Sequence, residues 1–302
     1  MILRLGRHAL AVLPVLTVAL ALGGCASQPD DPGPVTPSPT GDPRVYGPLQ
    51  VARQGGADWL TSQTAVNRQL EAVWEPCMKA AGYDVPPPTP SREQLLADGY
   101  HIAYGTDLAD PTVREREGYG VTSRLVGVPS VYAQPAAIVE FAKTLTTEAQ
   151  KNAFDTILTT CGDTARSEVL PTVELTQLDN LSGSVQDGVR KDPRMLAANA
   201  AWASCMAKAG YPYRGPDQPK ADLGARATPL YKQQQPGVVT PAAQQLHDQE
   251  LAIAAADWTC RSTTITPALQ TVRNELETQF VKSNATLVDK VRQQMKAVVD
   301  RG

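Results

Sequence analysis

Apolar side chains recur along most of the chain at spacings of three, four and seven residues, which is the period of a helix that buries one face. The longest such series follows Thr266–Pro267 and extends to Val298, so it predicts a final helix of about 30 residues. Strands that alternate with helices, as in a parallel sheet, are not indicated, and only "SRLVGVPSVYA" favours a short strand. The pattern therefore predicts a mainly α fold.

Capping residues mark where several of these helices begin. A Ser or Thr followed three residues later by Gln matches a capping box, and a polar residue followed by Pro matches the first turn of a helix. Four helix starts are expected on this basis: Ser91 with Gln94, Thr147 with Gln150, Asp192–Pro193 and Thr240–Pro241. Gly99 is expected to end the helix that follows Ser91, and the Pro/Gly-rich stretches 84–90 and 212–237 are expected to be long loops.

One ten-residue phrase occurs twice, as "WEPCMKAAGY" at 74–83 and "WASCMAKAGY" at 202–211. In each copy Trp, Cys and Met stand at helical positions i, i+3 and i+4, so they share one face, and the Gly that follows is where a left-handed residue normally ends a helix. The motif residues are Trp74, Met78, Gly82 and Tyr83 in the first copy and Trp202, Met206, Gly210 and Tyr211 in the second. Each Tyr is expected to fold back on the last helical turn, and Pro76 is expected to kink the first copy. The phrase is interpreted as a structural helix motif.

Four cysteines lie beyond the N-terminal region: Cys77, Cys161, Cys205 and Cys260. An even number outside the cytoplasm indicates two disulfides, for which three connectivities are open. Because Cys77 and Cys205 occupy the same place in the two phrases, the simplest symmetrical scheme pairs Cys77 with Cys161 and Cys205 with Cys260. A second symmetrical scheme joins phrase to phrase and the two remaining cysteines to each other.

The N-terminus has the features of a signal for export. Arg4 and Arg7 precede the apolar run 9–21, which is long enough for the core of a signal peptide and too short to span a bilayer comfortably as a helix. The run ends in Leu-Gly-Gly-Cys at 22–25, which resembles the lipobox of bacterial lipoproteins. That resemblance implies cleavage before Cys25 and attachment of a lipid such as palmitate to it, which anchors the protein at the extracytoplasmic face of the cell membrane. An ordinary secretory signal is the alternative.

Four segments are expected from these observations. Residues 1–24 form the signal peptide, and residues 25–48 comprise the lipidated Cys25 and a Pro-rich tether with too few large apolar side chains to fold. An extended tether of this length holds the folded body up to roughly 70 Å from the lipid surface. The rest is expected to form two tandem helical units, 49–189 and 190–302, each closed by its own disulfide.

Charge and composition exclude several function classes. Once Arg4 and Arg7 are removed with the signal, 26 basic residues face 31 acidic ones, and no basic stripe is present, so nucleic acid is not an expected partner. His101 and His247 stand apart from each other and from the cysteines, and no sequence motif for a metal or cofactor is found, so none is expected. The Cys–Met pair of each phrase offers the soft sulfur ligands that copper(I) prefers, but a disulfide and a core methionine explain it better.

Two groups of residues are candidates for chemistry. "REREGYG" places Glu115, Glu117 and Tyr119 in an expected loop, and a pair of carboxylates is what glycan hydrolysis requires. A solvated charged segment explains this stretch equally well. Asp257 is expected at the surface and Trp258 in the core, rather than as a sugar-binding platform.

The W-x-x-C-M-x-x-x-G-Y phrase, followed by a later Cys, resembles a pattern of lipoproteins and secreted proteins of actinomycetes, and the Arg-, Ala- and Pro-rich composition is typical of such bacteria. The resemblance implies location and disulfides, but no activity. The leading hypothesis is a non-enzymatic extracytoplasmic lipoprotein that binds an envelope partner: a transporter component, another protein or a cell-wall polymer. The alternatives are an envelope hydrolase that uses the loop carboxylates, and a solute-binding lipoprotein, a class that usually has two lobes of alternating strands and helices.

Overall fold

The computed structural model describes residues 46–302 except 134 and 236, and within this range the regular structure is entirely helical. The α-helices are α1 (Pro48–Arg53), α2 (Trp59–Ala80), α3 (Arg92–Tyr104), α4 (Pro111–Glu117), α5 (Ala136–Thr144), α6 (Glu148–Val169), α7 (Thr172–Lys191), α8 (Pro193–Lys208), α9 (Gln218–Gln233), α10 (Pro241–Thr263), α11 (Ile265–Ser283) and α12 (Ala285–Arg301), with 3₁₀ turns η1 (Asp107–Ala109) and η2 (Ser123–Val126). The mainly α fold is confirmed. Cys25 and the signal and tether assignments that precede residue 46 lie outside the described residues.

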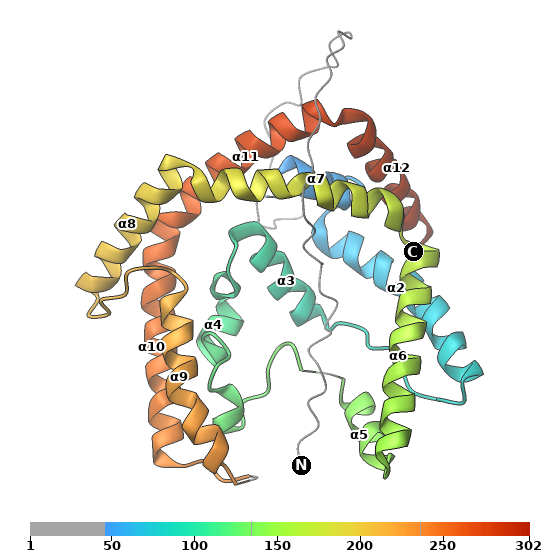
Figure 1. Ribbon diagram of the computed structural model, residues 1–302, viewed down its shortest axis with the longest axis horizontal. Helices are drawn as coiled ribbons and strands as arrows, with labels where there is room; N and C mark the ends of the chain where they lie inside the picture. The colour runs from blue at the N-terminus through green and yellow to red at the C-terminus, as the bar shows by residue number, and fades with distance from the viewer. Residues whose placement is uncertain (1–45, 134, 236) are drawn as a thin grey trace.

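The helices form an arch (Figure 1). Helices α7 and α11 pack along each other at the top, and two helix pairs descend from them. Helices α2 and α6 form one pair, here called the first arm, and α8 and α10 form the other, here called the second arm. The shorter helices α3 and α4 lie between the arms, and α9 packs against α10. None of the described helices is long and apolar enough to cross a membrane.

Each arm is closed by one disulfide. Cys77 of α2 is bonded to Cys161 of α6, and Cys205 of α8 to Cys260 of α10, with Cα–Cα distances of 5.6 and 5.7 Å. The pairing within each copy is confirmed, and the phrase-to-phrase alternative is wrong. The repeated phrase therefore supplies one half of a disulfide-linked helix pair in both arms.

The two copies of the phrase end in the same way. Gly82 and Gly210 have φ values of 87° and 92°, in the left-handed region that favours glycine. The next amide folds back, so that Tyr83 N donates to Met78 O at 2.9 Å and Tyr211 N to Met206 O at 2.8 Å. This is the Schellman arrangement, and it satisfies carbonyls that the helix end leaves free. The expected terminations are confirmed.

The expected single C-terminal helix is wrong. The chain turns at Asn284, whose N–H donates to Phe280 O at 3.0 Å, and α11 and α12 are separate helices. The turn brings α12 back over α1 and α2, and α11 lies along α7. The two C-terminal helices thereby share one apolar cluster with α1, α2 and α7, and its buried residues are Leu49, Ala52, Val66, Leu178, Val185, Phe280, Val288, Val291, Met295 and Val298. Burial of this surface, rather than the local periodicity, decides where the helix breaks.

Several local expectations also need correction. Helix α3 continues through Gly99, which is buried, and ends at Gly105, which has a φ of 69°. The expected short strand is wrong, because its residues form η2 and turns. The stretch 212–237 contains α9, in which Pro219 lies in the first turn, where its missing N–H removes no helical bond. Helix α2 continues through Pro76 to Ala80, and the four helix starts at Ser91, Thr147, Asp192 and Thr240 are confirmed. The expectation that Thr266–Pro267 opens the last helix is wrong, because α11 begins at Ile265 and both residues lie in its first turn.

Candidate binding site

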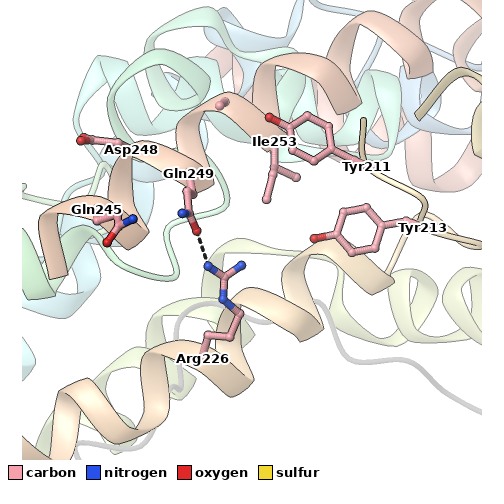
Figure 2. A pocket seen from close by; sticks show the side chains of 8 residues that line it. Tyr211, Tyr213, Arg226, Gln245, Asp248, Gln249 and Ile253 are labelled. Atoms are coloured by element: carbon pink, nitrogen blue, oxygen red, sulfur yellow. Dashed lines mark hydrogen bonds between the residues drawn. The ribbon is translucent and has the colours of Figure 1, made fainter. Parts of the chain in front are cut away.

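A cavity of about 380 Å³ opens on the second arm between α9, α10 and the loop that follows α8 (Figure 2). Its lining comprises Tyr211, Tyr213, Arg226, Gln245, Asp248, Gln249, Ala252 and Ile253. Ile253 belongs to the buried core, whereas Ala252 beside it is exposed. The two tyrosines approach from the loop, and Arg226 approaches from α9 (Figure 2). The cavity thus has an apolar and aromatic floor with polar groups around it.

Some of the polar groups at the rim are bonded to one another or to Asp222 beside it. Arg226 donates from Nη2 to Gln249 Oε1, and its Nη1 lies 3.4 Å from Asp222 Oδ2. The hydroxyl of Tyr213 donates to the same Asp222 oxygen at 3.1 Å. Burial raises the pKa of the Tyr213 phenol, and its hydrogen bond to Asp222 raises it further, so the phenol is neutral and donates at physiological pH. Arg226, Gln249, Asp222 and Tyr213 are therefore bonded to one another without a ligand.

The loop that carries Tyr211 and Tyr213 is fixed from α10. Arg261 donates from Nη2 to the carbonyl oxygen of Pro216 at 2.7 Å, and from Nε to Asp257 Oδ1 at 2.7 Å. The Schellman turn at Gly210 fixes the other end of the loop. Because both ends are held, the tyrosine side chains keep their place beside Ile253.

Asp257 is buried inside the second arm, so the expectation that it lies at the surface is wrong. Its side chain is fully buried and accepts from Trp202 Nε1 at 2.6 Å and from the Tyr119 hydroxyl at 2.6 Å, in addition to Arg261. Burial is the main cause that raises the pKa of Tyr119 well above its ordinary value, and the neighbouring Asp257 charge adds to it. A buried carboxylate is stable here because donors from three separate segments surround it.

A second buried carboxylate, Glu250, holds the loop after α4. It accepts from the backbone N–H groups of Tyr119, Val121 and Thr122 at 2.9, 2.8 and 2.8 Å. The Thr122 hydroxyl also bonds to Glu250, and it lies 2.9 Å from Nδ1 of His247. Both Glu250 oxygens are thus occupied in fixing this loop to α10, which is a structural role.

The carboxylates considered for hydrolysis are not brought together. Glu115 and Glu117 lie on helix α4 rather than in a loop, two residues apart, so they face different sides. Glu117 is 2% exposed, accepts from Val131 N at 2.7 Å and pairs with Arg116 at 2.6 Å, whereas Glu115 is 75% exposed. A polar hollow of about 340 Å³ nearby includes one carboxylate, Glu93, which lies 2.8 Å from Arg116.

The remaining sequence candidates have structural partners. Trp74, Met78, Trp202 and Met206 are buried on the inner faces of their arms. Trp258 is half-buried, packs edge-on against Tyr104 and lies under the guanidinium of Arg114. The expectation that it belongs fully to the core is therefore wrong. His101 lies 2.9 Å from Asp107, and within the described part of the chain no group of His, Cys, Asp and Glu has the arrangement of a metal site.

The cavity itself was missed by sequence reasoning. Tyr213 and Arg226 lie in the stretch that was expected to be a loop, and Gln245, Asp248 and Gln249 look like the polar face of an ordinary helix. The repeated Tyr211 is the one signal that could have located it. No protein-family model, curated protein or solved structure matches the chain.

Proposed function

We propose that this protein is an extracytoplasmic lipoprotein, anchored through a lipid on Cys25, that binds a partner of the cell envelope at the cavity on the second arm. The apolar run followed by Leu-Gly-Gly-Cys supports the anchor. Two disulfides support an oxidising compartment outside the cytoplasm, because thiols inside it are kept reduced.

The observation that carries the binding role is the construction of the cavity. Its floor consists of Ile253 and two tyrosine rings, and the polar groups of Arg226 and Gln249 at its rim are bonded to each other. An apolar floor with a few polar groups around it is typical of sites that recognise a ligand. We therefore favour a binding role without catalysis.

Two competing functions receive less support. Hydrolysis by paired carboxylates requires two acids across one groove, but Glu117 is buried and bonded whereas Glu115 points to solvent. A solute-binding lipoprotein is expected to have lobes of alternating strands and helices, whereas the described residues form helices and turns. The acidic balance of the chain argues against nucleic acid as the partner.

The anchor is tested by expressing the full chain in a bacterial host fed an alkyne-labelled fatty acid. Wild-type protein should incorporate the label and fractionate with membranes, and Cys25→Ser should lose the label and be released or remain as unprocessed precursor. Ser27→Ala, two residues further on, is the matched control and should behave as wild type. A Cys25→Ser protein that is processed, labelled and membrane-bound as before contradicts the proposal.

A further inference from the structure

The two arms place equivalent residues at the end of the repeated phrase. Tyr83 and Tyr211 are its last residues, and Phe154 and Ile253 each stand seven residues before the disulfide cysteine of the second helix. Tyr83 lies against Phe154, with ring centroids 5.2 Å apart. Tyr211 and Ile253 likewise lie together, as part of the cavity lining (Figure 2). In both arms, therefore, the last tyrosine of the phrase lies beside the residue seven positions before the second disulfide cysteine.

In the first arm, this surface is covered by the protein itself. Phe141 of α5 lies 6.0 Å from Tyr83 and 5.1 Å from Phe154, measured between ring centroids. Helix α5 stands beside the lower part of α6 (Figure 1). Ile138 of α5 is buried in the apolar cluster that also contains Phe154. The covering group is thus an aromatic side chain presented by a short amphipathic helix.

In the second arm, none of the described helices presents an aromatic ring at the corresponding place. Helix α9 packs on α10 there, and at the tyrosines it presents Arg226, which is bonded to Gln249. Helix α9 is held where it is by the buried Leu223 and Ala227 and by the Tyr231 hydroxyl, which donates to Val121 O at 2.7 Å. Within the described part of the chain, the cavity above Tyr211 and Ile253 is therefore open.

We propose that this cavity receives an aromatic side chain from a partner protein, in the position that Phe141 occupies in the first arm. The inference rests on the proposed binding function and names the class of its ligand. Tyrosine rings offer edge and face contacts to a further ring, and Ile253 provides an apolar base. An aromatic side chain is favoured over a glycan because Phe141 fills the equivalent place in the first arm. At the rim, Arg226 and Gln249 already bond to each other, and Gln245 and Asp248 are the lining groups that a glycan would use.

The test uses the full lipidated chain, purified in detergent with its disulfides intact, and a displayed library of random peptides. Ala252→Trp fills the cavity from an exposed position, and Ala255→Trp places the same side chain at an exposed position of α10 outside the cavity. Selected peptides should share an aromatic residue and bind Ala252→Trp about tenfold more weakly or worse, but Ala255→Trp as they bind wild type. Matching circular dichroism and thermal unfolding of the two variants exclude misfolding as the cause.

A second variant probes the cavity by removing a side chain instead of filling the space. Tyr213→Ala removes one wall of the cavity and should weaken the binding of the peptides selected on wild type. It should not affect the binding of peptides that were selected on the Ala252→Trp variant. Selected peptides that lack a common aromatic residue, or that bind Ala252→Trp as tightly as wild type, overturn the inference. So does a chitotetraose probe that shifts the Tyr211 and Tyr213 NMR signals in wild type but not in Ala252→Trp.

Failure of this inference is distinguishable from failure of the proposed function. Peptides that bind elsewhere on the chain overturn the aromatic-cavity inference and leave an envelope-binding role intact. Loss of lipid labelling in wild type contradicts the anchored location, whereas the peptide measurement on the purified chain still reports on the cavity.

Discussion

The indole N–H of Trp202 donates to Asp257 Oδ1 at 2.6 Å, and this buried bond joins the repeated phrase of α8 to the middle of α10. Asp257 stands three residues before Cys260, and the residue three before Cys161 in the first arm is Leu158. The two arms thus share their disulfide and their tryptophan, but one has a carboxylate at the centre where the other has an aliphatic side chain. The carboxylate makes α8, α10 and the loop at Tyr119 depend on one another.

Asp257→Asn should destabilise the protein strongly. The amide keeps the size of the side chain but removes the charge that pairs with Arg261 and turns one acceptor into a donor, so Trp202 or Tyr119 loses its partner. Breaking a buried pair in this way typically costs 3–5 kcal/mol, so a loss of about 3 kcal/mol in unfolding free energy is expected. Urea unfolding followed by tryptophan fluorescence measures it.

Asp248→Asn is the matched control for Asp257→Asn. Asp248 is an exposed carboxylate on the same helix, and its replacement should change the unfolding free energy by less than about 0.5 kcal/mol. Equal effects of the two substitutions would show that the buried bonds of Asp257 contribute little.

Gly210→Ala should destabilise the second arm through the backbone alone. Gly210 has a φ of 92°, and an added Cβ meets no atom within 4 Å, so no steric clash contributes. A left-handed conformation costs an L-residue roughly 1–2 kcal/mol. Thermal unfolding should show this loss for Gly210→Ala and for Gly82→Ala, whose φ is 87°, and not for Gly215→Ala, which also lies in open space but without a positive φ. A Gly215→Ala variant that melts as early as Gly210→Ala is inconsistent with a backbone effect.

Removal of one disulfide should loosen mainly its own arm. In the Cys205→Ala, Cys260→Ala double mutant, which leaves no free thiol, a loss of about 2–5 kcal/mol is expected. Hydrogen exchange should accelerate in α8, α9 and α10, whereas α12 should stay protected because it packs on α1, α2 and α7. The Cys77→Ala, Cys161→Ala pair is the reciprocal variant and should expose α2 and α6. Uniform acceleration along the chain in both mutants would mean that the arms unfold as one unit.

The buried Glu277 should make stability fall as the pH rises above about 4.5. Its carboxylate accepts from Leu49 N at 3.0 Å, and burial raises its pKa above the ordinary value of 4.5, although Arg273 and Arg53 act in the opposite direction. A raised pKa means that the folded state holds this proton more tightly than the unfolded chain does. The stability contributed by the protonated form is therefore lost as the pH rises through the folded pKa.

Glu277→Gln isolates this effect, since the amide is neutral throughout and its oxygen still accepts from Leu49. The unfolding free energy of Glu277→Gln minus that of wild type should increase with pH from 4.5 upward and then level off. For Glu275→Gln on the same helix, the unfolding free energy of the variant minus that of wild type should instead decrease as the pH rises toward 4.5. The reason is that Arg194 lowers the pKa of the exposed Glu275. A difference for Glu277→Gln that does not vary with pH contradicts the raised pKa.

Features that depend only on neighbours along the chain can be predicted from the amino-acid sequence. Helix starts at Ser91, Thr147, Asp192 and Thr240 were readable because a cap involves residues within one turn. The left-handed ends at Gly82 and Gly210 follow for the same reason. The disulfide pairing was also readable, although its partners are 84 and 55 residues apart, because the repeated phrase supplied a symmetry that selected one scheme.

The burial of particular polar residues and the position of the cavity depend on how distant helices pack. Asp257 looks like a surface residue in the sequence, and its partners Trp202 and Tyr119 are 55 and 138 positions away. The break at Asn284 depends in the same way on distant apolar residues such as Leu49 and Leu178, against which α11 and α12 are packed. The cavity exists because α9 brings Arg226 to Tyr211 where α5 brings Phe141 to Tyr83. Such differences depend on which surface of the protein each helix packs against, and the periodicity of the helix itself does not specify that surface.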